Sequence, residues 1–348
     1  MNRIRLHNTD FEGLNNVYLL DGDDGSGGAA AGDEVVLVDL GVSIPDVRAE
    51  LVDGLAAHGH DVSDVDRVFL THWHADHAGL ASFVQAESGA TLHAHEADAE
   101  LIAGGEAALR EERRRQRDRF VDWGIPEEPR QELDSFLAGH NDLVGDPCDV
   151  EPFSDGDTFD VNGRTLEAVH LPGHAAGLSA FADEAAGEAF VGDVILPEYT
   201  PNVGGADVRV DAPLSTYVDS LLAVVERDWD VAWPGHRDRI GDPAGRAAEI
   251  LDHHRERTRR VVDVLDRHGP ATPWEVSDRL FGALETIHIL HGPGEAYAHL
   301  DHLESHGVAD RTGSDYELSV DDPDVDALFP DVDADDDADA AADRGVEH

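Results

Sequence analysis

Short apolar or alternating runs recur from the N-terminus to residue 236 and predict β-strands. They lie at residues 4–7, 17–20, 35–40, 67–70, 91–93, 165–171, 178–182, 189–194 and 231–233. Between these runs, apolar residues spaced three or four positions apart predict helices over residues 45–58, 78–87 and 213–227. Strands therefore alternate with helices through most of this part of the chain.

The alternation is interrupted over residues 96–140, where Glu, Arg, Leu and Ala predict an insertion of two or three helices, broken near residues 124–129. Six arginines fall between Arg110 and Arg119. A second cluster comprises Arg255, Arg257, Arg259 and Arg260. Two interpretations stay open. The arginines either form solvated helix faces paired with neighbouring acids, or recognise an anion near the mouth of a functional site.

The pattern changes again after residue 243. Helices are predicted over residues 244–268, 274–281 and 295–306, and a hairpin over residues 308–318. Gly292-Pro293-Gly294 is expected to precede the third helix. Three helices and a hairpin in this order are typical of a winged helix, so we expect a first domain over residues 1–243 and a winged-helix-like domain over residues 244–320. Because the third helix holds no Arg or Lys, a structural, dimerising or substrate-flanking role is favoured over DNA binding.

The charge of the chain is strongly acidic. It holds 75 Asp and Glu against 25 Lys and Arg, a formal charge of −50, and every fixed cation is an arginine. Such a surface repels itself in dilute salt and is screened in concentrated salt. The composition resembles that of extremely halophilic archaea, so we expect the fold to need molar salt. Residues 321–348 hold eleven aspartates among few apolar residues and predict a disordered acidic tail.

The sequence also bears on location and partners. No apolar run approaches the ~18–20 residues that cross a bilayer, and the first residues lack the apolar stretch of a signal peptide. The single cysteine, Cys148, excludes an intramolecular disulfide and a CxxC metal site. We therefore expect a cytoplasmic protein without a membrane partner. The net charge disfavours nonspecific binding to nucleic acid, although a local basic site is compatible with it.

Residues with metal-ligand chemistry gather at the predicted ends of strands. Thr71-His72-Trp73-His74-Ala75-Asp76-His77 places three imidazoles and a carboxylate in one loop. His174, Asp193 and His236 each follow a later strand, and glycine or proline before each histidine permits a tight turn. Asp39 ends an earlier strand. Because imidazole and carboxylate together suit zinc or another first-row metal ion, these residues predict a metal site.

With Pro172-Gly173-His174, Gly192-Asp193 and Pro234-Gly235-His236, the loop resembles the five-part signature of the metallo-β-lactamase superfamily of hydrolases, over roughly residues 1–240. The resemblance implies an α/β fold, a four-layer αββα sandwich with a dinuclear metal site at one edge. The implied ligands of one ion are His72, His74 and His174. Those of the other are Asp76, His77 and His236, with Asp193 bridging the two. Asp39 would orient a ligand.

The form of the signature narrows the implied function. A bridging Asp193, with no cysteine there, resembles the glyoxalase II, lactonase and ribonuclease branches, and the C-terminal module resembles that of β-lactamase-like protein 2. The implied reaction is hydrolysis of a small thioester, lactone or ester, as in a hydroxyacylglutathione hydrolase, by a hydroxide generated between two divalent ions. Zn²⁺ is the favoured ion, and Mn and Fe also suit the ligands. Asp76 would orient the water and accept its proton.

Two other activities stay open. A single-strand-specific endoribonuclease would use the arginine clusters and the winged helix as a track for RNA. A mononuclear iron persulfide dioxygenase shares the His-x-His-x-Asp-His loop but spares some ligands of the second site. A small-molecule substrate is favoured as the partner over RNA, and a homodimer through the C-terminal domain is compatible with the pattern.

Overall fold

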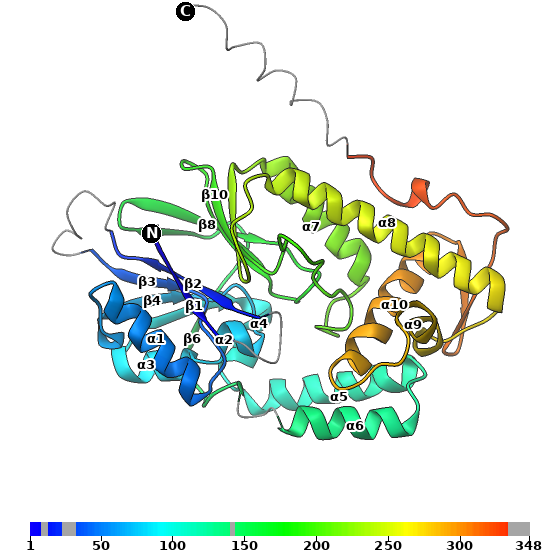
Figure 1. The fold of residues 1–348 in the computed structure, drawn as a ribbon, viewed down its shortest axis with the longest axis horizontal. Helices are drawn as coiled ribbons and strands as arrows, with labels where there is room; N and C mark the ends of the chain where they lie inside the picture. The colour runs from blue at the N-terminus through cyan, green and yellow to red at the C-terminus, as the bar shows by residue number, and fades with distance from the viewer. Residues whose placement is uncertain (8–12, 23–32, 140–142, 333–348) are drawn as a thin grey trace, which may run out of the picture.

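The first β-sheet has six strands in the order β1-β2-β3-β4-β5-β6 (Figure 1). The structure is a computed structural model that describes residues 1–7, 13–22, 33–139 and 143–332. The strands are β1 Asn2–Leu6, β2 Asn15–Leu20, β3 Val35–Val38, β4 Val65–Phe69, β5 Thr91–His95 and β6 Val150–Phe153. The first three pair antiparallel, with Tyr18 opposite Val38, and β3 to β6 run parallel.

The second sheet has five strands in the order β11-β10-β9-β8-β7. They are β7 Thr158–Val161, β8 Arg164–His170, β9 Ser179–Asp183, β10 Glu188–Gly192 and β11 Val231–Pro234. Neighbours pair antiparallel except β10 and β11, which run parallel. The strands β6 and β7 were not predicted, because Glu151 and Pro152 in β6 and Asp160 in β7 interrupt their apolar pattern.

The two sheets pack face to face between layers of helices. Val36 and Val38 of β3 point into the core between the sheets, where they meet Phe181 and Phe190 of the second sheet. The alternate residues of β3 pack under helices on the outer face. Because β3 is buried on both faces, its sequence is a continuous apolar run. The αββα sandwich predicted from the sequence is confirmed.

Helices cover both outer faces of the sandwich. α1 Pro45–Ala57 and α3 Ala81–Ser88 cover the first sheet, and α7 Pro213–Arg227 covers the second. α7 presents Leu214, Tyr217, Leu221 and Val224 to the core. The helix predicted over residues 78–87 is α3, which begins three residues later, and an unpredicted one-turn helix, α2 Ala75–Ala78, precedes it.

The predicted insertion consists of three helices, α4 Glu96–Ile102, α5 Glu106–Asp122 and α6 Glu127–Gly139. Beyond the sandwich lie α8 Pro243–His268, α9 Pro273–Phe281, α10 His288–Ser305, β12 Ala309–Thr312 and β13 Asp315–Leu318. This is the order predicted from the sequence, and the winged-helix assignment stays a prediction. α8 packs along α7 with its first half and against α9 and α10 with its second half.

The insertion and the C-terminal helices share a core of their own. Phe120, Trp123 and Leu133 of the insertion pack against Ile289 and Leu290 of α10. In Figure 1, α5 and α6 accordingly lie beside α9 and α10. No helix in the described ranges has both the length and the apolar content needed to cross a membrane.

Two predictions about the C-terminal part are wrong. α10 begins at His288 instead of residue 295, so that Pro293 lies inside the helix. Gly294 also lies inside the helix. A glycine is needed there for packing, because a Cβ would overlap the backbone of Gly205. Residues 321–332 were expected to be disordered, yet Val325 and Phe329 are buried in the core. The rest of the predicted acidic tail, residues 333–348, lies outside the described residues.

Candidate metal centre

Three imidazole nitrogens converge beside the loop that follows β4. His72 Nε2 lies 2.9 Å from His74 Nδ1, and His174 Nε2 lies 3.1 Å from the same nitrogen. The side chains of His72 and His174 are buried, and that of His74 is half-buried. His72 and His74 follow a strand of the first sheet, whereas His174 follows β8 in the second. The group therefore draws donor atoms from both sheets.

A second group of donor atoms lies beside the first. The Nε2 atoms of His77 and His236 lie 3.6 Å and 3.4 Å from Asp76 Oδ2. The same two nitrogens lie 3.6 Å and 3.4 Å from Asp193 Oδ2. Asp193 Oδ2 is also 3.8 Å from His174 Nε2 of the first group. Asp193 thus lies between the two groups, as expected of a ligand shared by two ions.

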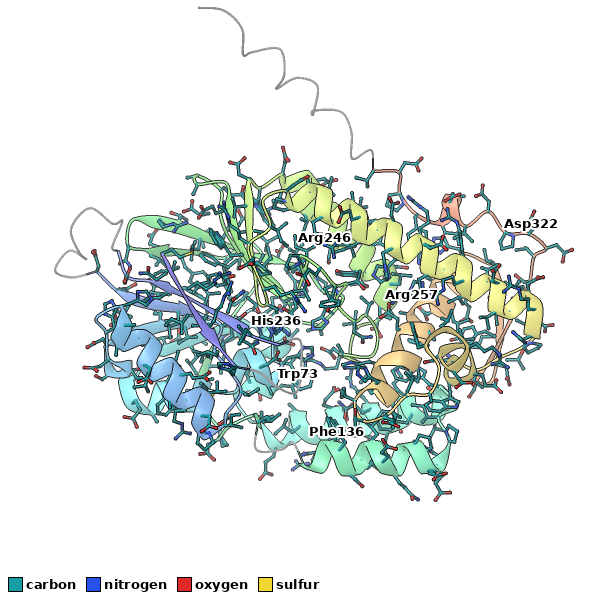
Figure 2. All side chains as sticks on the ribbon, viewed as in Figure 1. Trp73, Phe136, His236, Arg246, Arg257 and Asp322 are labelled. Carbon is teal, nitrogen blue, oxygen red and sulfur yellow. The ribbon has the colours of Figure 1, made fainter. Side chains whose placement is uncertain are left out.

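The ends of parallel strands bring these side chains together. Asp193 follows β10 and His236 follows β11, its parallel neighbour, so both emerge at the same edge of the second sheet. The turn before His236 needs Gly235, because a Cβ at that position would overlap the ring of His77 and the carboxylate of Asp193. Figure 2 places His236 between the two halves of the sandwich.

Hydrogen bonds to the outer ring nitrogens orient the histidines. Asp39 Oδ2 accepts a hydrogen bond from His77 Nδ1 at 2.9 Å. The backbone oxygens of Asn202 and Ala206 lie 2.9 Å from His174 Nδ1 and 3.1 Å from His74 Nε2. Such outer partners set the tautomer and leave the inner nitrogen able to bind a metal. Asp39, predicted to orient a ligand, contacts one of the predicted ligands.

The crowded charges shift the pKa values of the centre. Burial alone would lower the pKa of His77, but Asp193 and Asp76 raise it well above its usual value. Burial favours the neutral form of Asp193, but His236 and His77 hold its pKa well below the usual range. Burial lowers the pKa of His72 well below its usual value. Burial favours the neutral form of Asp76 as well, but His77 and His236 lower its pKa. Both carboxylates therefore stay ionised and make the site attractive to cations.

The donor atoms fit divalent metal ions. His77 Nε2 and His236 Nε2 are buried and form ion pairs with Asp76 and Asp193, but make no hydrogen bond among the described residues. A bound cation would give these nitrogens a direct partner. Ligand atoms ~2.0–2.1 Å from a tetrahedral zinc lie ~3.3 Å from one another, close to the separations seen here. All seven predicted ligands lie in the groups His72-His74-His174, His72-His77-Asp193 and Asp76-His77-His236.

His170 and Arg237 lie close to predicted ligands in the sequence but are not in the ligand groups, whereas Asn15 contacts a ligand and was not predicted. His170 Nε2 lies 2.8 Å from the backbone oxygen of Ala176. Arg237 donates to Glu198 at 2.7 Å, so it pairs with an acid. Asn15, which was not singled out from the sequence, donates to Asp76 Oδ2 at 3.2 Å. No sequence motif marks Asn15, because its role depends on where β2 passes the loop.

Most arginines of the two clusters are held in ion pairs. Arg114 bonds to Glu111 and Asp118 along α5, and Arg257 donates to the buried Glu295 at 2.6 Å. The other cluster members paired with acids are Arg110, Arg115, Arg255 and Arg259. These pairings favour the interpretation of internally compensated helix faces over a surface that recognises anions.

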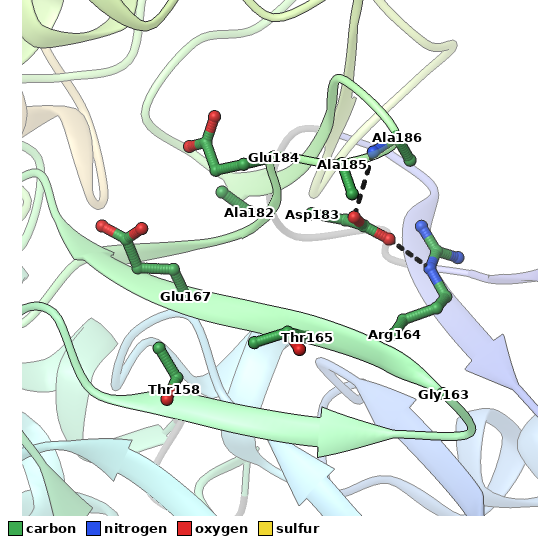
Figure 3. Close-up of a pocket in the computed structure, with 10 residues that line it drawn as sticks. All are labelled: Thr158, Gly163, Arg164, Thr165, Glu167, Ala182, Asp183, Glu184, Ala185 and Ala186. Carbon is green, nitrogen blue, oxygen red and sulfur yellow. Dashed lines mark hydrogen bonds and ion pairs between the residues drawn. The ribbon is translucent and has the colours of Figure 1, made fainter.

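A surface cavity of about 610 Å³ lies away from the metal centre (Figure 3). It opens at the start of β8, whereas His174 follows the end of that strand. Arg164 Nε donates to Asp183 Oδ2 at 2.6 Å beside it, and small residues such as Ala185 and Ala186 complete the lining. The cavity contains none of the predicted metal ligands.

Comparisons with known proteins agree with this architecture. Residues 11–236 match the family model described as the metallo-beta-lactamase superfamily. The chain is 26% identical over 280 residues to the probable metallo-hydrolase YqjP of Bacillus subtilis (strain 168), covering 79% of this chain and 86% of that protein. It is 27% identical over 232 residues to an atrochrysone carboxyl ACP thioesterase of Aspergillus fumigatus, covering 66% of this chain but only 41% of the fungal protein.

Two solved structures are similar over most of the chain. A metallo-beta-lactamase family protein from Thermus thermophilus has a TM-score of 0.76 and 30% identity, covering 91% of this chain and 98% of that one. A beta-lactamase domain protein from Burkholderia ambifaria has a TM-score of 0.73 and 24% identity, covering 91% of both chains. Because residue 236 falls well short of 91% of the chain, the shared fold extends into the C-terminal helices.

Proposed function

We propose a reaction for this protein, which belongs to the metallo-beta-lactamase superfamily and is a metallo-hydrolase. In this proposal it hydrolyses a small thioester with two divalent ions. The observation that carries the proposal is the convergence of two groups of donor atoms joined by Asp193, with His77 Nε2 and His236 Nε2 buried and without hydrogen-bond partners among the described residues. Zinc is the proposed ion, and manganese or iron would also suit these ligands.

Each part of the centre has a proposed role. Two bound divalent ions would lower the pKa of a water molecule to near neutrality and polarise the bond to be cleaved. Asp76 would orient that water and accept its proton. Its Oδ2 lies 3.4 Å from His236 Nε2, and Asn15 Nδ2 donates to it at 3.2 Å. The bond from Asn15 favours the ionised carboxylate, which is the form that can take up a proton.

A thioester suits this site better than the alternative substrates. The thiolate leaves without a general acid, because thiols have a pKa of only about 8.5, and the A. fumigatus relative is a thioesterase by name. Cleavage of RNA is less well supported, because most arginines of the two clusters are held in ion pairs and the net charge is −50. The second group of donors, Asp76, His77 and His236, supports two ions over the single iron of a persulfide dioxygenase.

Metal analysis followed by a substrate panel would test this proposal. Protein purified in molar KCl should contain two ions per chain and should cleave thioesters in preference to lactones, esters and single-stranded RNA. His74→Ala and Asp76→Ala should each lower the hydrolysis rate at least ~100-fold and reduce the metal content. His306→Ala, at an exposed histidine away from the centre, is the control. Full activity in either centre variant would refute the assignment, as would one iron per chain.

A further inference from the structure

The loop at residues 202–207 connects the metal centre to α10. Its backbone carries the oxygens of Asn202 and Ala206 that lie against the outer nitrogens of His174 and His74. The loop is not part of either sheet, so something else must hold these oxygens in place. At its far end the loop's own buried Asp207 accepts from Trp73 Nε1 and Ala176 N. At its near end the loop contacts a buried carboxylate from outside it, Glu295 of α10.

Glu295 accepts two hydrogen bonds from the loop. Its Oε2 accepts from Asn202 Nδ2 at 3.0 Å and from Val203 N at 3.1 Å. The backbone oxygen of the same Asn202 lies 2.9 Å from His174 Nδ1. One residue therefore separates the carboxylate of Glu295 from a predicted metal ligand that lies 121 positions earlier in the sequence.

The other oxygen of Glu295 is held by a buried polar cluster. Arg257 Nη1 donates to Oε1 at 2.6 Å, and His299 Nε2 lies 3.7 Å from the same oxygen. His254 Nδ1 lies 3.9 Å from that oxygen. Two imidazoles and a carboxylate at such distances could suggest a further metal site, but the guanidinium already occupies Oε1 and would repel a cation there. The cluster instead fixes Glu295, which is only 3% exposed, as an ionised anchor.

The backbones of α10 and the loop also touch. A Cβ at Gly294 would overlap the backbone of Gly205, and a Cβ at Gly204 would overlap the backbone oxygen of Gly294. Asn202 Nδ2 donates in addition to the backbone oxygen of His291 at 3.1 Å. Gly294, which looked like part of a helix break in the sequence, therefore allows α10 to approach the loop closely enough for Glu295 to reach it.

We propose that Glu295 is a positioning residue for the half of the metal centre that contains His174 and His74. This inference rests on the proposed function, because it takes the two histidines to bind an ion. Through Asn202, α10 fixes the orientation of the His174 ring toward the metal. Its contact with Gly205 supports the backbone next to Ala206, which faces the His74 ring. The C-terminal helices are then a part of the metal centre, and removing the charge of Glu295 loosens one ion of the two.

Glu295→Gln tests the proposal with little change in volume. A glutamine has one acceptor oxygen, so it cannot satisfy both the loop donors and Arg257, and its amide group must face one of these donors. We expect one ion to be lost to a chelator at least ~10-fold more readily than from the wild type, while the second is retained. With Co²⁺ in place of the native ion, the absorption spectrum of the affected site should change as well, which general destabilisation would not cause.

Leu300→Ala is the matched control. Leu300 is fully buried on the same helix and packs against α8 and α9, in a core that contains no residue of the loop. It should lower the melting temperature and leave chelator resistance and the Co²⁺ spectrum unchanged. The proposal is overturned if Glu295→Gln keeps both ions as the wild type does, or if Leu300→Ala loses the same ion equally. A wild type with two ions and no thioesterase activity would count against the proposed substrate alone.

Discussion

Replacing Asp39 by Asn should weaken the ion that His77 binds while leaving the protein folded. Asp39 is 2% exposed, and its carboxylate accepts from Thr71 N and Oγ1 at 2.8 Å each and from His77 Nδ1 at 2.9 Å. The bond to His77 keeps the ring proton on Nδ1 and leaves Nε2 able to bind a metal. An amide group in its place would donate to Nδ1 and move the proton to Nε2, where it blocks the metal.

The size of the effect follows from the lost bonds. Thr71 Oγ1 can rotate and accept from the new amide, so mainly the bond to His77 changes, from a charge-assisted to a neutral one. Such a change costs ~1–2 kcal/mol of unfolding free energy. Loss of an outer partner of a metal-bound histidine typically weakens metal binding ~10–100-fold, which corresponds to ~1.4–2.7 kcal/mol of binding free energy.

Competition with a chromophoric chelator in molar KCl would measure this difference for each ion. Asp46→Asn makes the same change of charge at an exposed position of α1 and should leave both affinities unchanged. Asp39 does not set the tautomer of His77 if Asp39→Asn lowers the unfolding free energy by the expected amount but binds both ions as tightly as the wild type.

Three further predictions concern stability. Burial, followed by the charge of Asp207, raises the pKa of Glu112 to about 7. The folded carboxyl thus keeps its proton at pH values where the unfolded one has lost it, and the unfolding free energy falls as pH rises from about 4.5 to 7. Glu112→Gln should remove this fall and be ~1–3 kcal/mol more stable than the wild type at pH 8 in denaturant titrations; equal stability there would count against a buried, protonated Glu112. Raising KCl from ~0.1 M to 1 M shortens the Debye length from ~10 Å to ~3 Å and should raise the melting temperature, and an unchanged value would contradict the expectation that the fold needs salt. Phe329 is buried against the ring of His302, with 5.0 Å between ring centroids, so Phe329→Ala should cost ~2–4 kcal/mol of unfolding free energy, whereas a neutral effect would mean that this segment does not pack.

Features encoded by neighbouring residues could be predicted from the sequence, whereas features that depend on distant contacts could not. The strand β3 could be predicted because its burial on both faces gives a continuous apolar run. The loop from His72 to His77 could be predicted because its ligand residues are closely spaced. The start of α10 could not, because Pro293 and its flanking glycines indicate a break unless the contact of Gly294 with residues 204–205 is known. The role of Asn202 was equally hidden, since its backbone oxygen, which any residue would supply, contacts the ligand.

The contacts of Phe329 and Val325 explain the error in the acidic tail. Aspartates dominate residues 321–332, so the composition predicts disorder. Two apolar side chains and an ion pair between Asp326 and Arg259 are nevertheless enough to hold this segment against α8. Average composition gives little weight to a few well-placed contacts, whereas packing depends on them.

The placement of the metal ligands has a consequence for folding. Each proposed ion has ligands from both sheets, His72 and His74 with His174 in one case, and Asp76 and His77 with His236 in the other. A bound ion therefore acts as a cross-link that forms only when the two halves of the sandwich are docked. Its binding adds ~1.4 kcal/mol to the unfolding free energy for each tenfold rise in free metal above the Kd. A shortage of metal would thus reduce the stability of the folded chain as well as its catalytic rate.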